Sequence, residues 1–153
     1  MMTLHCWLES VKGWYQPNHS HDFSELVTLI QQTPSSMMDE LDNETGSEAL
    51  AYWLDACFRL TKYYQHQGYN EQAFGYIQLS YAKLQAVVCD ASYSAELKRW
   101  SLKKLDRIIV AMVEFCQHQT DPQWQQESVQ LINLHVAFME SQQHLNLKYA
   151  AKN

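Results

Sequence analysis

The stretch that decides the fold is residues 63–84, YYQHQGYNEQAFGYIQLSYAKL. Gly68 is where one helix is expected to end, because the residue after a helix often adopts a left-handed conformation that glycine tolerates best. Asn70, two residues later, can cap a second helix. The apolar residues on both sides of this turn recur at helical spacing. The stretch therefore predicts a hairpin of two helices, with His66 at a helix end rather than in a catalytic pocket.

The two helices of this first hairpin are predicted over 48–67 and 71–90, within residues 48–92. Ser47 can cap the first of them. Each helix carries an apolar stripe: Leu50, Trp53, Leu54, Cys57, Leu60, Thr61 and Tyr64 on the first, and Ala73, Ile77, Ser80 and Leu84 on the second.

A second hairpin is predicted over residues 94–144. Ser94 can cap a helix over 95–119, and Thr120 or Asp121 can cap a helix over 122–144. Pro122 suits the first turn of that helix, where its missing N–H costs nothing. The tail, 145–153, is expected to fray.

The first third of the chain is predicted to be less regular. Residues 1–34 should hold two short helices, one over 3–15 and one that begins after Ser20 or Asp22 and ends at Pro34. Residues 35–47, SSMMDELDNETGS, are predicted to form a mobile acidic loop because they combine four acidic residues with a glycine.

Composition favours a single all-α domain. The chain has 153 residues, of which 46% are apolar, with only four Gly and three Pro. So few turn formers disfavour a fold of many short strands. The net charge is −6, with twelve acids and four bases over 1–97 and five acids and seven bases over 98–153. Nucleic-acid binders usually carry a basic domain, so nucleic acid is not the expected partner.

The expected location is the cytoplasm. The four cysteines form no CxxC pair, which favours reduced thiols. The N-terminal stretch lacks the uninterrupted apolar region of a signal peptide. No stretch approaches the roughly 18 apolar residues of a membrane span, so no membrane partner is expected.

The sequence shows weak similarity to itself when it is shifted by 52 residues. Gln65-His66-Gln67 then falls on Gln117-His118-Gln119, and Gln78-Leu79 falls on Gln130-Leu131. Each copy is a helix, a turn after QHQ, and a second helix. True duplication and chance in a Gln-rich chain both remain open.

The first hairpin resembles a tetratricopeptide repeat, best over residues 50–85. The residues that carry the resemblance are Leu60, Tyr64, Gly68, Ala73, Ile77 and Ser80. The chain departs from that family at Cys57, Thr61 and Gln85, and its spacing is near 52 residues rather than about 34. A second copy near 102–137 matches poorly. The resemblance implies stacked antiparallel helical hairpins, and such arrays usually bind other proteins. A closed four-helix bundle is the alternative architecture.

Two surfaces are candidates for protein binding. The resemblance implies a groove lined by Asp55, Phe58, Lys62 and Gln65, which share one helix face at i, i+3, i+7 and i+10. Alternatively, Phe58 packs beneath the N-terminal helices. The second surface is a basic ridge of Arg99, Lys103 and Arg107, aligned at i, i+4 and i+8 opposite Ile108 and Met112. This ridge could receive an acidic partner, a phosphorylated peptide or the chain's own acidic loop at 39–44, or it could simply be solvated.

The segment His19-Ser20-His21-Asp22 is a weaker candidate, for metal binding. Two histidines at i and i+2 beside an aspartate are of the residue types that bind transition metals. A polar loop ahead of a helix cap is the simpler interpretation of the same residues.

The sequence therefore predicts a non-enzymatic adaptor or regulator that binds a peptide or helix, with no catalytic residue and no cofactor. A small metal-binding enzyme or sensor is the alternative. A third hypothesis is a homodimer in which exposed aromatic residues bury one another. The identity of the partner, the pathway and the oligomeric state do not follow from the sequence.

Overall fold

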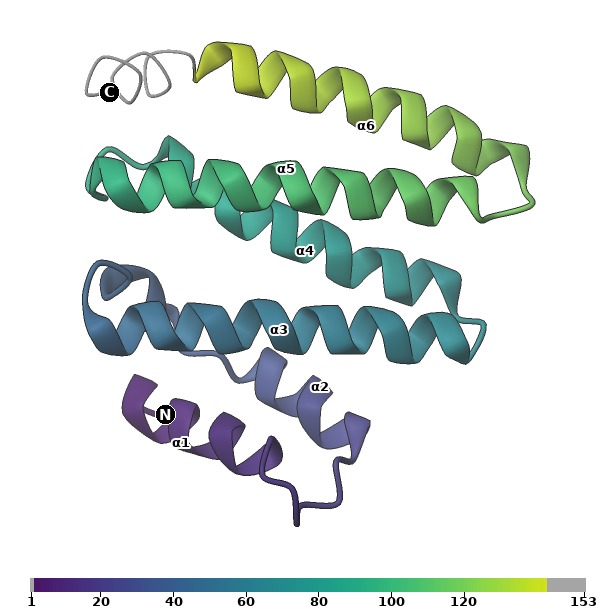
Figure 1. Ribbon diagram of the computed structural model, residues 1–153. Coiled ribbons are helices and arrows are strands. Elements are labelled where there is room, and N and C mark those ends of the chain that lie inside the picture. The colour runs from purple at the N-terminus through teal and green to yellow at the C-terminus, as the bar shows by residue number, and fades with distance from the viewer. Residues whose placement is uncertain (1, 143–153) are drawn as a thin grey trace. The chain divides into compact units, whose positions relative to one another are not determined.

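A computed structural model of the chain describes residues 2–142. The described residues form α-helices and one short 3-10 helix, and contain no strand (Figure 1). The all-α prediction is therefore confirmed. In chain order the elements are α1 (Leu4–Trp14), α2 (Phe23–Gln31), η1 (Ser35–Asp39), α3 (Glu44–His66), α4 (Asn70–Cys89), α5 (Ala95–Gln117) and α6 (Pro122–Ser141).

The chain divides into two compact units, Met1–Tyr76 and Ile77–Asn153. The boundary falls inside α4, so this helix belongs partly to each unit. The single domain predicted over 1–153, and the choice between an open array and a closed bundle, stay predictions. The predicted tail, 145–153, lies outside the described residues.

In the first unit, α1 and α2 pack on α3. Two tryptophans of α1 combine burial with satisfied indole N–H groups: Trp7 Nε1 donates to the carbonyl of Leu29 at 2.7 Å, and Trp14 Nε1 donates to the carbonyl of Asp22 at 2.8 Å. A buried indole needs such an acceptor, because an unmade hydrogen bond costs about 1–3 kcal/mol. These bonds fix α2 against α1, and Asp22, as predicted, caps α2 by accepting from Ser24 N.

The segment between α2 and α3 is more ordered than the predicted acidic loop over 35–47. Residues Ser35–Asp39 form a 3-10 helix, and Met37 and Leu41 are buried. The helix α3 begins at Glu44 rather than at residue 48, because Asn43, not Ser47, is its cap: the Asn43 side chain accepts from Gly46 N at 2.9 Å. Asp39, Asp42 and Glu44 are exposed, whereas Met37 and Leu41 of the same segment are part of the core.

The turn between α3 and α4 has the predicted conformation. Gly68 has a φ of +83°, and Tyr69 N donates to the carbonyl of Tyr64 at 2.9 Å, which satisfies an otherwise unpaired helix-end carbonyl. The rings of Tyr64 and Tyr76 stack across this turn with centroids 5.8 Å apart. In this stretch the tyrosines pack against one another, while His66 is exposed at the end of α3.

In the second unit, α5 and α6 form an antiparallel hairpin (Figure 1). The caps are those predicted: Ser94 accepts from Leu97 N, and Asp121 accepts from Gln123 N. At the turn, the ring of Phe115 meets that of Trp124 edge-on at 5.4 Å. The buried side of α5 includes Leu102, Leu105, Met112, Phe115 and Cys116.

The two helix pairs match in length. Helices α3 and α5 each have 23 residues, and α4 and α6 each have 20. With the 52-residue offset, the buried residues Ala49, Leu50, Trp53 and Leu60 of α3 correspond to the buried residues Ser101, Leu102, Leu105 and Met112 of α5. The shared plan of helix, turn and helix is thus present twice, whereas duplication as its origin stays a hypothesis.

Candidate functional site

Phe58 lies on the exposed side of α3 and is the centre of the first candidate surface. Its side chain is 56% exposed, so the alternative in which Phe58 packs beneath the N-terminal helices is wrong. The ammonium of Lys62 lies 5.3 Å from the centroid of the Phe58 ring, within the range of a cation–π interaction. Asp55 and Lys62 are exposed on the same side, and Gln65 is half-buried near the end of the helix.

Asp55 is held in place by two donors. Tyr15 of the segment after α1 donates its O–H to Asp55 Oδ2 at 2.6 Å, and Arg59 Nε donates to the same oxygen at 2.8 Å. The Arg59 guanidinium also lies 4.8 Å from the centroid of the Tyr15 ring. These three residues therefore orient one another, so that Arg59 lies beside Phe58 in a defined position.

The same contacts keep the Tyr15 hydroxyl protonated. Burial raises the pKa of Tyr15 above its ordinary value, and the Asp55 carboxylate that accepts its hydrogen bond raises that pKa further. The Tyr15 ring also meets the Tyr52 ring of α3 edge-on at 5.3 Å. Tyr15 is therefore a fixed donor that joins the segment after α1 to the exposed side of α3.

We call Asp55, Phe58, Arg59 and Lys62, with Tyr15 behind them, the Phe58 surface. It combines one exposed aromatic ring with two cations in a unit that is otherwise acidic, since residues 1–76 hold ten acids and three bases. Such a surface suits an apolar side chain with a carboxylate nearby. Sequence reasoning missed Tyr15 and Arg59. The i, i+4 spacing of Asp55 and Arg59 was a usable signal, whereas nothing local indicates Tyr15, which is 40 residues away.

The predicted basic ridge lies on α5. Lys103 and Arg107 are exposed and Arg99 is half-buried; of the two residues predicted on the opposite side, Met112 is buried and Ile108 is half-buried. Nearby, the Lys104 ammonium lies 5.4 Å from the centroid of the Trp100 ring, which is 38% exposed. This ridge and the Phe58 surface belong to different units of the chain.

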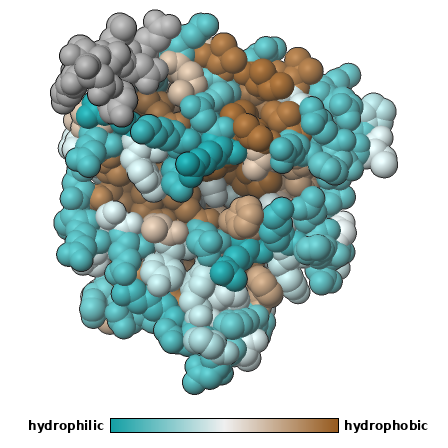
Figure 2. All heavy atoms as spheres, viewed as in Figure 1, coloured by the Kyte–Doolittle hydropathy of each residue, from teal (hydrophilic) through white to brown (hydrophobic). Residues whose placement is uncertain are grey.

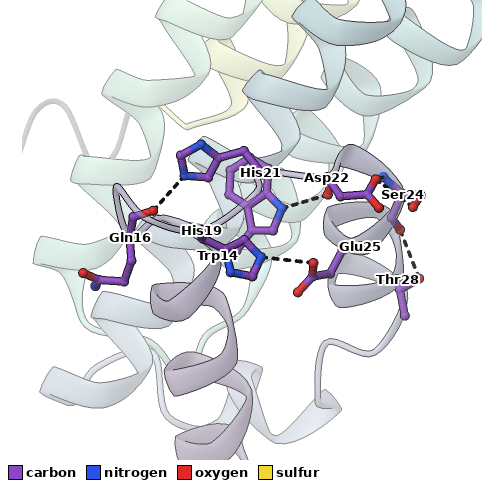
Figure 3. Close-up of polar contacts among 8 residues, drawn as sticks. All are labelled: Trp14, Gln16, His19, His21, Asp22, Ser24, Glu25 and Thr28. Carbon is purple, nitrogen blue, oxygen red and sulfur yellow. Dashed lines mark hydrogen bonds and ion pairs between the residues drawn. The ribbon is translucent and has the colours of Figure 1, made fainter.

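The residues of the HSHD segment have separate local roles (Figure 3). His19 Nε2 donates to the Glu25 carboxylate at 3.1 Å, and His21 Nε2 donates to the carbonyl of Gln16 at 2.9 Å. Asp22 accepts from both the backbone N–H and the hydroxyl of Ser24, as a helix cap does. Within residues 2–142, no group of three or more His, Cys, Asp or Glu side chains is placed to hold a metal ion.

His135 forms a polar network that sequence reasoning missed. Its Nε2 donates to Asp106 Oδ1 at 2.9 Å, and its Nδ1 is hydrogen-bonded to the Tyr81 hydroxyl at 2.8 Å. His135 is buried, and the network joins α4, α5 and α6 within the second unit. Burial raises the pKa of Tyr81, and the charge of Asp106 adds to that effect. Helical spacing places His135 on the same side of α6 as Trp124 and Ser128, which was the available signal.

Comparison with known proteins supplies a family but no activity. The chain belongs to the family described as "Protein of unknown function (DUF2753)", whose model matches residues 25–148. No curated protein matches the chain, and no solved structure matches it. Among the described helices, none is both long and apolar enough to cross a membrane.

Proposed function

We propose that this chain is a non-enzymatic protein-binding module, an adaptor or regulator, that binds a peptide or helix of another protein through the Phe58 surface. The observation that carries the proposal is the 56% exposure of the Phe58 ring, with the Lys62 ammonium 5.3 Å from its centroid and Arg59 as the next residue of the helix. Phenylalanine and arginine are both enriched at the buried centres of protein interfaces.

The mechanism follows from the contacts around the ring. An apolar side chain of the partner would cover Phe58, and a carboxylate of the partner would lie near Lys62 and Arg59. Because Tyr15 and Asp55 already hold Arg59 in place, little side-chain freedom is lost when the partner binds. The resemblance of residues 50–85 to a protein-binding repeat supports the same proposal.

The basic ridge on α5 is a second surface for the same function. Lys103 and Arg107 are exposed on the helix that carries Trp100, and the Lys104 ammonium lies over the Trp100 ring, which again combines cations with an aromatic ring. An acidic or phosphorylated segment of a partner is the expected ligand. The metal-binding alternative lacks comparable support, because His19, His21 and Asp22 are bonded to different local groups.

Affinity capture from extracts of cells that express the chain tests the Phe58 surface. The test variant is Phe58→Ala, and the matched control is Tyr69→Ala, because both side chains are 56% exposed aromatics in the same unit. We expect a protein that binds the wild type and the control but not Phe58→Ala, and that binds directly when purified. Capture of the same proteins by all three chains would refute the proposal for this surface.

Charge reversal tests the ridge separately. The variant Lys103→Glu/Arg107→Glu should lose any partner that binds through α5 while keeping partners of the Phe58 surface. If the captured proteins do not change, the ridge is a solvated helix face and not a binding surface.

A further inference from the structure

Helix α6 carries a row of apolar residues that is exposed to solvent, next to exposed polar residues such as Gln130 and Asn133. Its buried residues are Ser128 and His135, whereas Val129, Ile132, Leu134 and Val136 are 58%, 42%, 69% and 48% exposed. Val129, Ile132 and Val136 follow one another at i, i+3 and i+7, and Met139 continues the row, so they share one helix face. We call these four residues the α6 outer face. Figure 2 shows hydrophobic side chains gathered over this helix.

The corresponding face of α4 is covered. With the 52-residue offset, Ile77, Ser80, Leu84 and Val87 of α4 correspond to Val129, Ile132, Val136 and Met139 of α6. Leu84 and Val87 are fully buried and Ser80 is 8% exposed. Thus α6 has the residue pattern of a covered helix, although Val129, Ile132 and Val136 are exposed and Met139 is only half-buried. A row of exposed apolar residues of this kind is typical of a binding surface.

The charges of α6 narrow the choice of occupant. Between Glu127 and Glu140 the helix has no Asp, Glu, Lys or Arg, and its one histidine, His135, is buried in the network with Asp106 and Tyr81. A charged partner therefore gains nothing at this face. An equally uncharged apolar row fits this face without leaving a charge unpaired, and α6 of a second copy is such a row.

We propose that the α6 outer face binds the α6 outer face of a second copy of this chain, with the two helices antiparallel about a two-fold axis. Such an interface is isologous and closes at the dimer. In this register Ile132 lies opposite Val136 of the second copy, and Val129 lies opposite Met139 of the second copy. Glu140 then faces Gln126 of the second copy, so no two carboxylates meet.

The size of the face determines the strength of this dimer. A stable interface usually buries about 800 Å² on each partner, more than one face of a 20-residue helix supplies. The pairing is therefore a reversible, concentration-dependent equilibrium. It goes beyond the proposed adaptor function, because α6 and the Phe58 surface belong to different units.

Sedimentation equilibrium of the full chain from low to high micromolar concentration tests the proposal. The wild-type average mass should rise from monomer toward dimer. Ile132→Glu, and independently Val129→Glu, should stay monomeric throughout, with unchanged helical circular dichroism. Val110→Glu is the matched control, since Val110 is 54% exposed on α5 of the same unit, and it should dimerise like the wild type.

Two results would overturn the pairing. One is a full-length wild type that is monomeric at every concentration. If only a chain ending at Gln142 then dimerised, residues 143–153 and not a second copy would be the occupant of the face. The other is equal behaviour of Ile132→Glu and Val110→Glu. Phe58→Ala should leave the dimer intact, so failure of the adaptor proposal and failure of this one are distinguishable.

Disulfide cross-linking tests the direction of the helices. In a chain with the exposed Cys6 and Cys89 replaced by Ser, Asn133→Cys should cross-link readily, because position 133 lies near the two-fold axis. Gln125→Cys should not, because the antiparallel register separates the two copies of that position. Equal cross-linking at both positions would contradict the antiparallel arrangement.

Discussion

On the exposed side of α3, single residues hold one another in place: Tyr15 and Arg59 both donate to Asp55. Helical spacing was enough to predict that Asp55, Phe58 and Lys62 share one face. It could not indicate whether Phe58 is covered, because that depends on where α1 and α2 lie. Nor could it indicate that Tyr15 donates to Asp55, since that contact arises only when the segment after α1 folds back on α3.

The raised pKa of Tyr15 predicts a stability loss in alkali. Above pH 10, the ordinary pKa of tyrosine, the unfolded chain loses the phenolic proton while the folded chain keeps it. The unfolded state then binds fewer protons, so the free energy of unfolding falls as pH rises. Tyr15→Phe should lower that free energy by about 1 kcal/mol at neutral pH through the lost hydrogen bond, and should weaken the alkaline fall.

Urea unfolding at pH 8 and above pH 10 checks this prediction. Tyr69→Phe, at a 56% exposed position, is the control and should fall with pH as the wild type does. An alkaline fall of the same size in Tyr15→Phe and in the wild type would show that the Tyr15 hydroxyl is not the group responsible.

Replacement of Ser101 is predicted to raise the free energy of unfolding, whereas Tyr15→Phe lowers it. Its hydroxyl is fully buried and is the one buried side-chain polar atom among the described residues that has no hydrogen-bond partner. The corresponding residue of α3 is Ala49, which is also fully buried. Ser101→Ala should therefore raise the free energy of unfolding by about 1 kcal/mol, because it removes an unsatisfied polar group. Denaturant unfolding measures the change, and a loss of stability would contradict it.

At the scale of helices, capping residues and apolar periodicity predicted most boundaries to within a few residues. The beginning of α3 was the exception. Asn43 and Ser47 are both good caps, and Gly46 after an acidic run is typical of a loop. Asn43 rather than Ser47 caps α3. Gly46 packs against the backbone of Glu40, and this contact, which the sequence pattern does not show, places Gly46 N where the Asn43 side chain can accept from it.

This contact makes Gly46 a position that only glycine fits. An added Cβ would collide with the carbonyl group of Glu40, which is backbone and cannot rotate away. Gly46→Ala should therefore lower the free energy of unfolding by about 1–3 kcal/mol. Gly75 lies within α4 with open space around it, so Gly75→Ala should instead raise that free energy by about 0.5–1 kcal/mol. Thermal unfolding of the two variants compares them, and equal effects would contradict the proposed packing.

At the scale of the whole chain, the sequence predicted two hairpins related by 52 residues, and the structure contains two helix pairs of matching length. The exposed outer face of α6 was not predicted. Periodicity shows which residues share a face, but it gives the same pattern for Leu84 of α4, which is buried, and Val136 of α6, which is 48% exposed. Their different exposure depends on tertiary packing, which periodicity does not show.

Site-specific photo-cross-linking in cells tests the central claim, that the Phe58 surface binds another protein, most directly. Benzoylphenylalanine at position 58 keeps an aromatic ring at the centre of the surface, and the same residue at position 69 is the control. We predict a cross-linked protein at position 58 that is absent at position 69 and that excess wild-type chain competes away. Identical cross-linked products at the two positions, or none at position 58, would contradict the claim.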